Sequence, residues 1–257
     1  MEDVRYEAAD GIARVTIDRP EQRNAMSFTV MDGLRESMAR ARVDDDVRVV
    51  VLTGAGDRAF CSGADLGGIS DTSAAAAHDG RGLLAELFRD MWGLGKPIVA
   101  RVRGYCLAGG FGLAMACDFV VAADDAQFGT PEINVGLWPY MITVPLLRSM
   151  PPKRAFELMA TGRRVDASEA ERIGFVTRVV PADELDAAVD ELCATITSKS
   201  PLIMRWGRDS FQHVLHMHPD AALAYLQGML TVTSGSDDTA EGVAAFVEKR
   251  EPRWTGR

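Results

Sequence analysis

The sequence AFCSGADL, at residues 59–66, follows an unbroken apolar run, Val47–Thr53, and the short glycine-rich turn that closes it. An apolar run without alternation is typical of a strand covered on both faces, as in a sheet flanked by helices. Small residues at the end of such a strand let backbone N–H groups approach a ligand without obstruction by side chains. These residues therefore predict an α/β fold with a ligand site at a strand end.

A second segment of the same kind is GYCLAGG, at residues 104–110. It follows the next apolar run, Ile98–Val102, and opens a short predicted helix at Phe111–Ala116. The amides at a helix N-terminus carry partial positive charge, which favours a developing anion. Glycine-rich turns are usually only turns, so neither segment alone identifies a site.

The flanking sequence extends this pattern in both directions. Asp10-Gly11 favours a tight hairpin between Val4–Ala8 and Ile12–Asp18, and Ser27 is the expected N-cap of a helix that ends near Arg42. A helix is expected at 82–94, after an Ala/Ser/Asp-rich stretch at 70–80 that we expect to be mobile. From residue 141 onward the apolar spacing predicts helices at about 141–149, 152–161, 168–173, 183–198, 201–216, 219–232 and 237–248.

Strand, strand and helix thus repeat along the N-terminal two-thirds of the chain, and the remainder is helical. We expect an α/β core of ββα units at residues 1–195. A helical extension at 196–257 is expected to belong to the same functional unit and to pack at subunit contacts.

Composition excludes several classes of protein. A formal net charge of −9 over 257 residues argues against a nucleic-acid surface, and no stretch approaches the ~20 apolar residues of a membrane-spanning helix. The N-terminus lacks the pattern of a secretory signal, and the four cysteines show no CxxC spacing, so we expect buried, reduced thiols in a cytoplasmic protein. The cluster of His213, His216 and His218 lacks an accompanying cysteine or carboxylate pattern, so no metal site is expected.

Taken in order and with their spacing, these segments resemble the enoyl-CoA hydratase/isomerase (crotonase) family. The resemblance covers essentially the whole chain. It rests on IDRP at 17–20, NA at 24–25, FCSGAD at 60–65, KPIVARVRG at 96–104, GG at 109–110, ACD at 116–118, AQFGTPE at 126–132 and FVEKR at 246–250.

The resemblance implies a crotonase-like spiral of ββα units, assembled as a homotrimer or a dimer of trimers. It also implies a thioester substrate carried by coenzyme A, with no separate cofactor. The thioester oxygen would sit between the backbone N–H groups of Ala64 and Gly109, and Glu132 would transfer the proton. Preorganised donors of this kind contribute about 3–4 kcal/mol each at a transition state that places charge on that oxygen.

Further substrate contacts are expected from family position. Arg23 is the best local cation for the coenzyme A phosphates, and Lys249 is another candidate. Trp138 and Tyr140 are expected to wall the acyl pocket, although aromatic residues are as often plain core. The remaining expected contacts are Asn24, Ala25, Ser62, Asp65, Leu66 and Gly110, of which Asp65 is also a natural loop-fixing aspartate.

One position departs from the hydratase pattern. The first of the two catalytic glutamates of the hydratases maps onto Gly112, which can transfer no proton. Hydration needs a water aligned for attack, and one carboxylate aligns it less well than two. We therefore expect isomerisation of a 3-enoyl-CoA to a 2-enoyl-CoA by Glu132, with enoyl-CoA hydratase as the alternative. A non-catalytic acyl-CoA-binding protein is the rival from another class.

Overall fold

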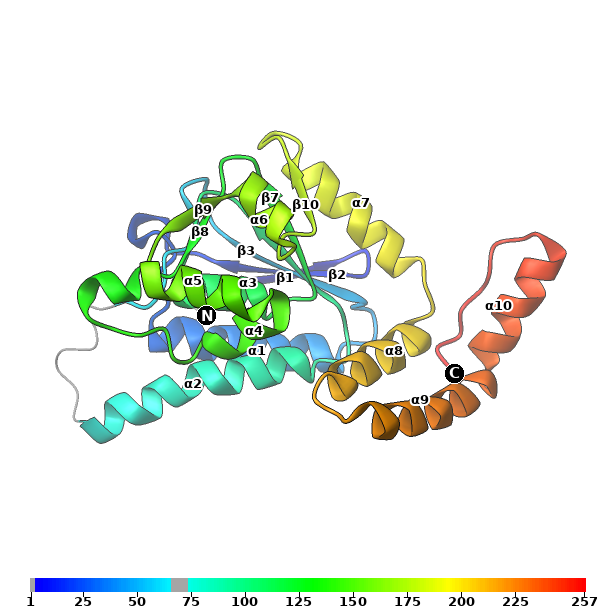
Figure 1. Cartoon of the computed structure of the whole chain (residues 1–257). Helices are drawn as coiled ribbons and strands as arrows, with labels where there is room; N and C mark the ends of the chain where they lie inside the picture. Colours follow the sequence, from blue (N-terminus) through cyan, green and yellow to red (C-terminus); the bar gives the residue numbers. More distant parts are fainter. Residues whose placement is uncertain (1–2, 66–73) are drawn as a thin grey trace.

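The computed structural model of the chain describes residues 3–65 and 74–257, and it contains two sheets (Figure 1). The larger sheet has six strands in the order β1-β2-β3-β5-β7-β10; β1 and β2 pair antiparallel and the other pairs are parallel. The β1–β2 hairpin turns at Asp10-Gly11, as predicted, with φ of 52° and 81°. The strands are β1 (Val4–Ala9), β2 (Ile12–Ile17), β3 (Val49–Gly54), β5 (Ile98–Val102), β7 (Phe119–Ala123) and β10 (Arg178–Val180).

The smaller sheet has the order β4-β6-β8-β9, with β4, β6 and β8 parallel and β9 antiparallel. Its strands are β4 (Ala59–Cys61), β6 (Tyr105–Leu107), β8 (Gln127–Gly129) and β9 (Arg164–Asp166). The chain therefore places β3, β5 and β7 in the large sheet and the strand that follows each of them in the small sheet. This alternation confirms the predicted spiral of ββα units.

Ten helices are present in the described residues, besides short 3₁₀ turns such as η1 (Pro20–Gln22) and η3 (Pro131–Val135). Those predicted after residue 141 begin and end within two residues of the predicted positions. The helices are α1 (Phe28–Val43), α2 (Ala74–Trp92), α3 (Gly109–Met115), α4 (Thr143–Ser149), α5 (Pro152–Thr161), α6 (Ala167–Ile173), α7 (Leu185–Thr197), α8 (Pro201–Val214), α9 (Pro219–Ser234) and α10 (Asp237–Glu248).

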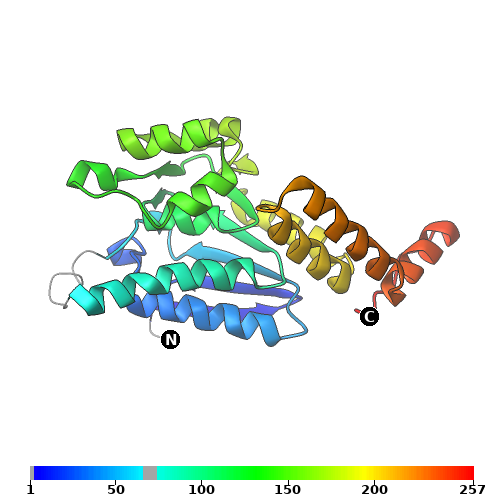
Figure 2. The same cartoon turned by 60° about the horizontal axis from the view of Figure 1, so that its bottom comes forward.

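Helices cover both faces of the large sheet, which explains the unbroken apolar run in β3. Val50 and Leu52 face a core shared with α1 and α2, two helices that lie side by side (Figure 2). Val49 and Val51 face the opposite way, into a second cluster with α7. Because successive strand side chains point to opposite faces, a strand buried on both sides is apolar at every position.

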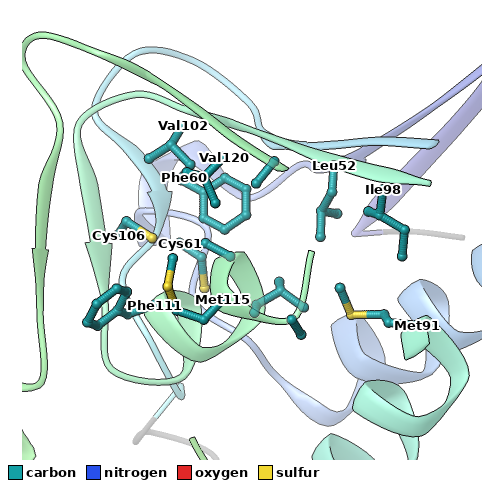
Figure 3. Packing of buried hydrophobic residues seen from close by; sticks show 14 of the residues in the cluster. Leu52, Phe60, Cys61, Met91, Ile98, Val102, Cys106, Phe111, Met115 and Val120 are labelled. Carbon is teal, nitrogen blue, oxygen red and sulfur yellow. The ribbon is translucent and has the colours of Figure 1, made fainter. Parts of the chain in front are cut away.

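Figure 3 shows aromatic and sulfur-containing side chains of α3 and the smaller sheet packed against aliphatic side chains of the larger sheet. Phe111 of α3 packs against Phe128 and Phe175, with ring centroids 5.7 and 5.2 Å away. Cys61 and Cys106 are fully buried here, and burial raises the pKa of the Cys61 thiol to about 12. This supports the prediction of buried, reduced thiols for these two cysteines.

The last three helices extend away from the two sheets (Figures 1 and 2). Arg208 of α8 attaches them to the core: it is 7% exposed and donates to Asp118 Oδ2 at 2.8 Å. Asp118 also accepts from the Ile98 amide, so this carboxylate joins α8 to the start of β5. In contrast, α9 buries none of its residues and exposes Leu223 and Leu230 by 67% and 68%.

Two sequence-based boundaries need correction. The helix predicted from residue 82 begins at Ala74, so part of the stretch at 70–80 that was expected to be mobile is helical; residues 66–73 lie outside the described part. Ala59–Cys61 forms strand β4, which the sequence pattern does not predict. A strand of three residues is too short to show a period-two pattern, which is why β4 escaped detection. No helix in the described residues is long and apolar enough to cross a membrane.

Candidate active site

The smaller sheet brings the three chemically interesting segments together. Strands β4, β6 and β8 are parallel neighbours, with Cys61 opposite Cys106 and Leu107 opposite Gly129. Parallel strands present their carboxyl ends at one edge of the sheet. Ala64, Gly109 and Glu132 each follow the end of one of these strands by two or three residues, so the fold gathers all three at the same edge.

The loop after β4 directs the Ala64 N–H away from the protein backbone next to it. Met26 donates to Gly63 O at 2.8 Å and accepts from Asp65 N at 2.9 Å, which holds the residues on either side of Ala64. Gly63 has a φ of +107°, a conformation that favours glycine. Within residues 3–65 and 74–257 the Ala64 N–H has no hydrogen-bond acceptor, so it is available to a ligand.

The second donor is the N–H of Gly109, the first residue of α3. An amide at this position has no acceptor within its own helix, and none is present elsewhere in the described part of the chain. A β-carbon built on Gly109 would lie 3.9 Å from the Ala64 nitrogen, which places the two amides side by side. The same β-carbon would lie 2.6 Å from the Met26 methyl group, so Met26 lines this position.

Glu132 sits on the 3₁₀ turn η3, which is anchored to α5. Thr130, fully buried, donates its hydroxyl to Leu158 O at 2.9 Å, and the backbone closes the turn through Leu137 N to Glu132 O at 3.0 Å. The Oε2 atom of Glu132 is buried and has no hydrogen-bond partner in the described structure. Burial accordingly raises the pKa of this carboxyl above its ordinary value of 4.5. An unpartnered buried carboxylate is costly for folding and is typical of functional sites.

Some of the predicted substrate contacts lie at this edge of the sheet. Arg23 accepts from the Ser62 amide through its carbonyl at 3.1 Å, and its exposed side chain therefore starts beside the Ala64 loop. Ala25 and Ser62 are half-buried at the same place. Leu66 lies outside the described residues.

Two other predicted contacts have structural roles instead. Asn24 is fully buried, and its amide donates to Ala55 O and Ala59 O at 3.0 and 2.7 Å. Gly110 is buried against strand β4, where a β-carbon would lie 2.3 Å from Cys61 O. The Asn24 side chain and Gly110 therefore hold the two loops together, in place of the predicted contact with the substrate.

Asp65 is held by Arg19, a residue of the IDRP motif with no predicted contact to the substrate. Arg19 pairs with Asp65 at 3.0 Å and donates to Ala25 O at 2.8 Å, and its side chain is 16% exposed. These contacts span the segment that carries Met26 and the loop that carries Ala64. The only sequence signal was the position of Arg19 in the IDRP motif, which does not reveal its partner.

We expect Arg19→Ala to lower kcat by roughly 10- to 100-fold with a smaller change in KM, because a misplaced Ala64 amide would weaken a transition-state contact. Arg19→Lys keeps the charge and is expected to recover part of the loss. The matched control is Arg5→Ala, which removes a more exposed ion pair, with Asp18 at 2.8 Å. Steady-state kinetics of the three variants test this; equal effects on kcat for Arg5 and Arg19 would contradict it.

The remaining predicted contacts lie further out. Trp138 packs against Phe156, with ring centroids 5.9 Å apart, and contacts the main core. Tyr140 is 76% exposed. Lys249 is exposed at the C-terminal end of α10, in the extension that projects from the sheets (Figure 1).

Two free amides and an unpartnered carboxylate at one edge of the sheet can stabilise a developing oxyanion while a proton is transferred. The fold and this arrangement thus suit an enzyme that forms an enolate-like intermediate. Comparison with known proteins gives the family: the enoyl-CoA hydratase/isomerase model matches residues 7–257, and the chain belongs to this family.

Individual relatives agree with this assignment. A Mycobacterium bovis protein named "Probable enoyl-CoA hydratase echA8" is 34% identical over 261 residues, which cover 100% of this chain and 99% of that protein. The carnitinyl-CoA dehydratase of Proteus mirabilis is 35% identical over 257 residues, with 96% and 95% covered. Among solved structures, an enoyl-CoA hydratase from Mycobacterium smegmatis superposes with a TM-score of 0.95 at 31% identity, with 98% of each chain covered.

Proposed function

We propose that this enzyme moves the double bond of a 3-enoyl-CoA to the 2-position. The ionised carboxylate of Glu132 removes a proton from C2, and the electron pair spreads through the double bond onto the thioester oxygen. The N–H groups of Ala64 and Gly109 hold that oxygen as the dienolate forms. Glu132 then returns the same proton to C4, so the 2-enoyl thioester leaves and the enzyme is unchanged.

The observation that carries this proposal is a buried, unpartnered carboxylate oxygen on Glu132 together with a glycine at position 112. Isomerisation needs one group that gives and takes a proton. Burial raises the pKa of Glu132 towards neutrality. A carboxyl group with such a pKa can both accept a proton and donate it again.

Hydration of a 2-enoyl-CoA is the second candidate, favoured by the names of several relatives. It requires a water held for attack at C3 as well as a proton for C2. In the hydratase pattern two carboxylates hold that water, and Gly112 supplies none. A site with one carboxylate is therefore better matched to proton transfer than to water addition.

We further propose that Arg23 binds the coenzyme A phosphates and that the enzyme is a cytoplasmic homotrimer or dimer of trimers. The exposed leucines of α9, together with Phe246 of α10 at 85% exposure, support burial of the extension in an assembly. Exposed apolar side chains that gather on one surface are typical of protein–protein contacts.

Product analysis tests the function directly. Purified protein is given 3-enoyl-CoA and 2-enoyl-CoA substrates of several chain lengths, and the products are identified by mass spectrometry and NMR. Formation of 2-enoyl-CoA from the 3-enoyl substrate supports isomerisation. Robust formation of 3-hydroxyacyl-CoA without isomerisation would show that the enzyme is a hydratase. Binding without turnover would favour a non-catalytic acyl-CoA-binding protein.

A further inference from the structure

We infer that Ile142 occupies the space that a side chain at position 112 would need, and that this residue thereby restricts the site to a single carboxylate. The inference deepens the proposed function and rests on it for its chemical meaning. The contact between position 112 of α3 and Ile142, before α4, can be tested by thermal stability, separately from the reaction.

The contact is closer than a side chain at 112 can tolerate. A β-carbon built on Gly112 would lie 2.1 Å from Cγ2 and 2.6 Å from Cβ of Ile142, both well inside van der Waals contact. These atoms are at the branch point of a β-branched side chain and not at its flexible end, so rotation about χ1 does not clear them both. Ile142 is 2% exposed, so it is enclosed by the core.

The backbone around Ile142 is also fixed. Its carbonyl accepts from Leu146 N at 3.1 Å, which commits it to the first turn of α4. At the other end of α4, Ser149 donates its hydroxyl to Met115 O at 3.1 Å, the last residue of α3. The two helices are thus joined, and α4 cannot withdraw to make room without losing this contact.

The Ile142 side chain determines which chemistry the site can perform. Position 112 is where the hydratase pattern places its first glutamate, and here the corresponding space is filled by an apolar side chain. The absence of a second carboxylate therefore depends both on the glycine at 112 and on Ile142. Restoring a glutamate at 112 requires removal of the Ile142 side chain in the same molecule.

A double-mutant cycle tests the contact between position 112 and Ile142. Gly112→Ala and Gly112→Glu are each expected to lower Tm by roughly 3–10 °C, as overpacked cores do. Ile142→Gly removes both clashing atoms and is expected to restore most of that loss in the double variants, measured against Ile142→Gly alone. Ile142→Ala keeps its β-carbon 2.6 Å away and is expected to restore much less.

The control for glycine replacement is Gly207→Ala in α8, where a β-carbon would meet nothing within 4 Å and Tm should not fall. Additive effects of the 112 and 142 substitutions would overturn the proposed contact.

The rate of 2-enoyl-CoA hydration is measured on the same variants. Folded Gly112→Glu/Ile142→Gly is expected to hydrate 2-enoyl-CoA at least about tenfold faster than Ile142→Gly, the lower end of what a positioned acid or base contributes. A coupled Tm without this gain would refute the role of Ile142 in selecting the reaction. Isomerisation of 3-enoyl-CoA by the wild type is the separate test of the proposed function, so failure of one is distinguishable from failure of the other.

Discussion

Glu132→Gln is expected to lower kcat for 3-enoyl-CoA isomerisation by about 10³-fold, within the range that a positioned acid–base group contributes. Glutamine has almost the same shape, so it can fill the position on η3, but it can neither accept the C2 proton nor return it to C4. The free amides of Ala64 and Gly109 still hold the thioester, and KM should change little. Steady-state kinetics with the 3-enoyl substrate measures both quantities.

The same substitution should increase stability at neutral pH. The folded-state pKa of Glu132 is raised, so between pH 4.5 and that raised value the folded chain binds more protons than the unfolded chain. The free energy of unfolding therefore falls as the pH rises through this window, and the full penalty is present above it. Removing the ionisable group removes the penalty, so the Tm advantage of Glu132→Gln should be largest at pH 7 and vanish near pH 4.

Glu157→Gln is the control, because its carboxylate on the neighbouring α5 is held by Arg163 and has a lowered pKa. It should lose stability without a comparable loss of kcat. A Glu132→Gln enzyme that retains wild-type kcat would remove Glu132 from the chemistry. The acyl-CoA-binding alternative would be favoured only if the wild type binds acyl-CoA without turnover.

Part of the candidate site could be predicted, because two of its segments have small residues after an apolar run. The family resemblance then singled out Ala64, Gly109 and Glu132, and the structure places these residues after the ends of β4, β6 and β8. The helices after residue 141 were also predictable, since several turns of apolar spacing give a strong period of 3.6. Features that depend on neighbouring residues were also predictable: Ser27 caps α1, as predicted, by accepting from Val30 N at 3.2 Å.

The residues that shape the site could not be predicted, because their roles depend on contacts across long sequence separations. In the sequence Ile142 is an ordinary apolar residue, and its contact with position 112 exists only because α4 packs against α3. Asn24 looks like a loop residue, yet its side chain joins two backbone carbonyls more than thirty residues away. In each case the sequence shows the residue type, and only the fold shows what that residue contacts.

Gly109→Pro is expected to lower kcat by about 10²–10³-fold, the usual loss on removing one oxyanion donor. Proline has no N–H, and Gly109 is the first residue of α3, so no intrahelical hydrogen bond is lost. Kinetics with the 3-enoyl substrate, together with circular dichroism to confirm folding, measures the effect.

Gly109→Ala separates the lost donor from the added bulk. Both variants place a β-carbon 2.6 Å from the Met26 methyl group, which is the end of a flexible side chain and can move aside. Only the proline removes the amide hydrogen. The alanine variant should therefore retain most of the activity that the proline variant loses. If the two variants lose activity equally, the loss comes from crowding at Met26, and the Gly109 amide is not the second donor to the thioester oxygen.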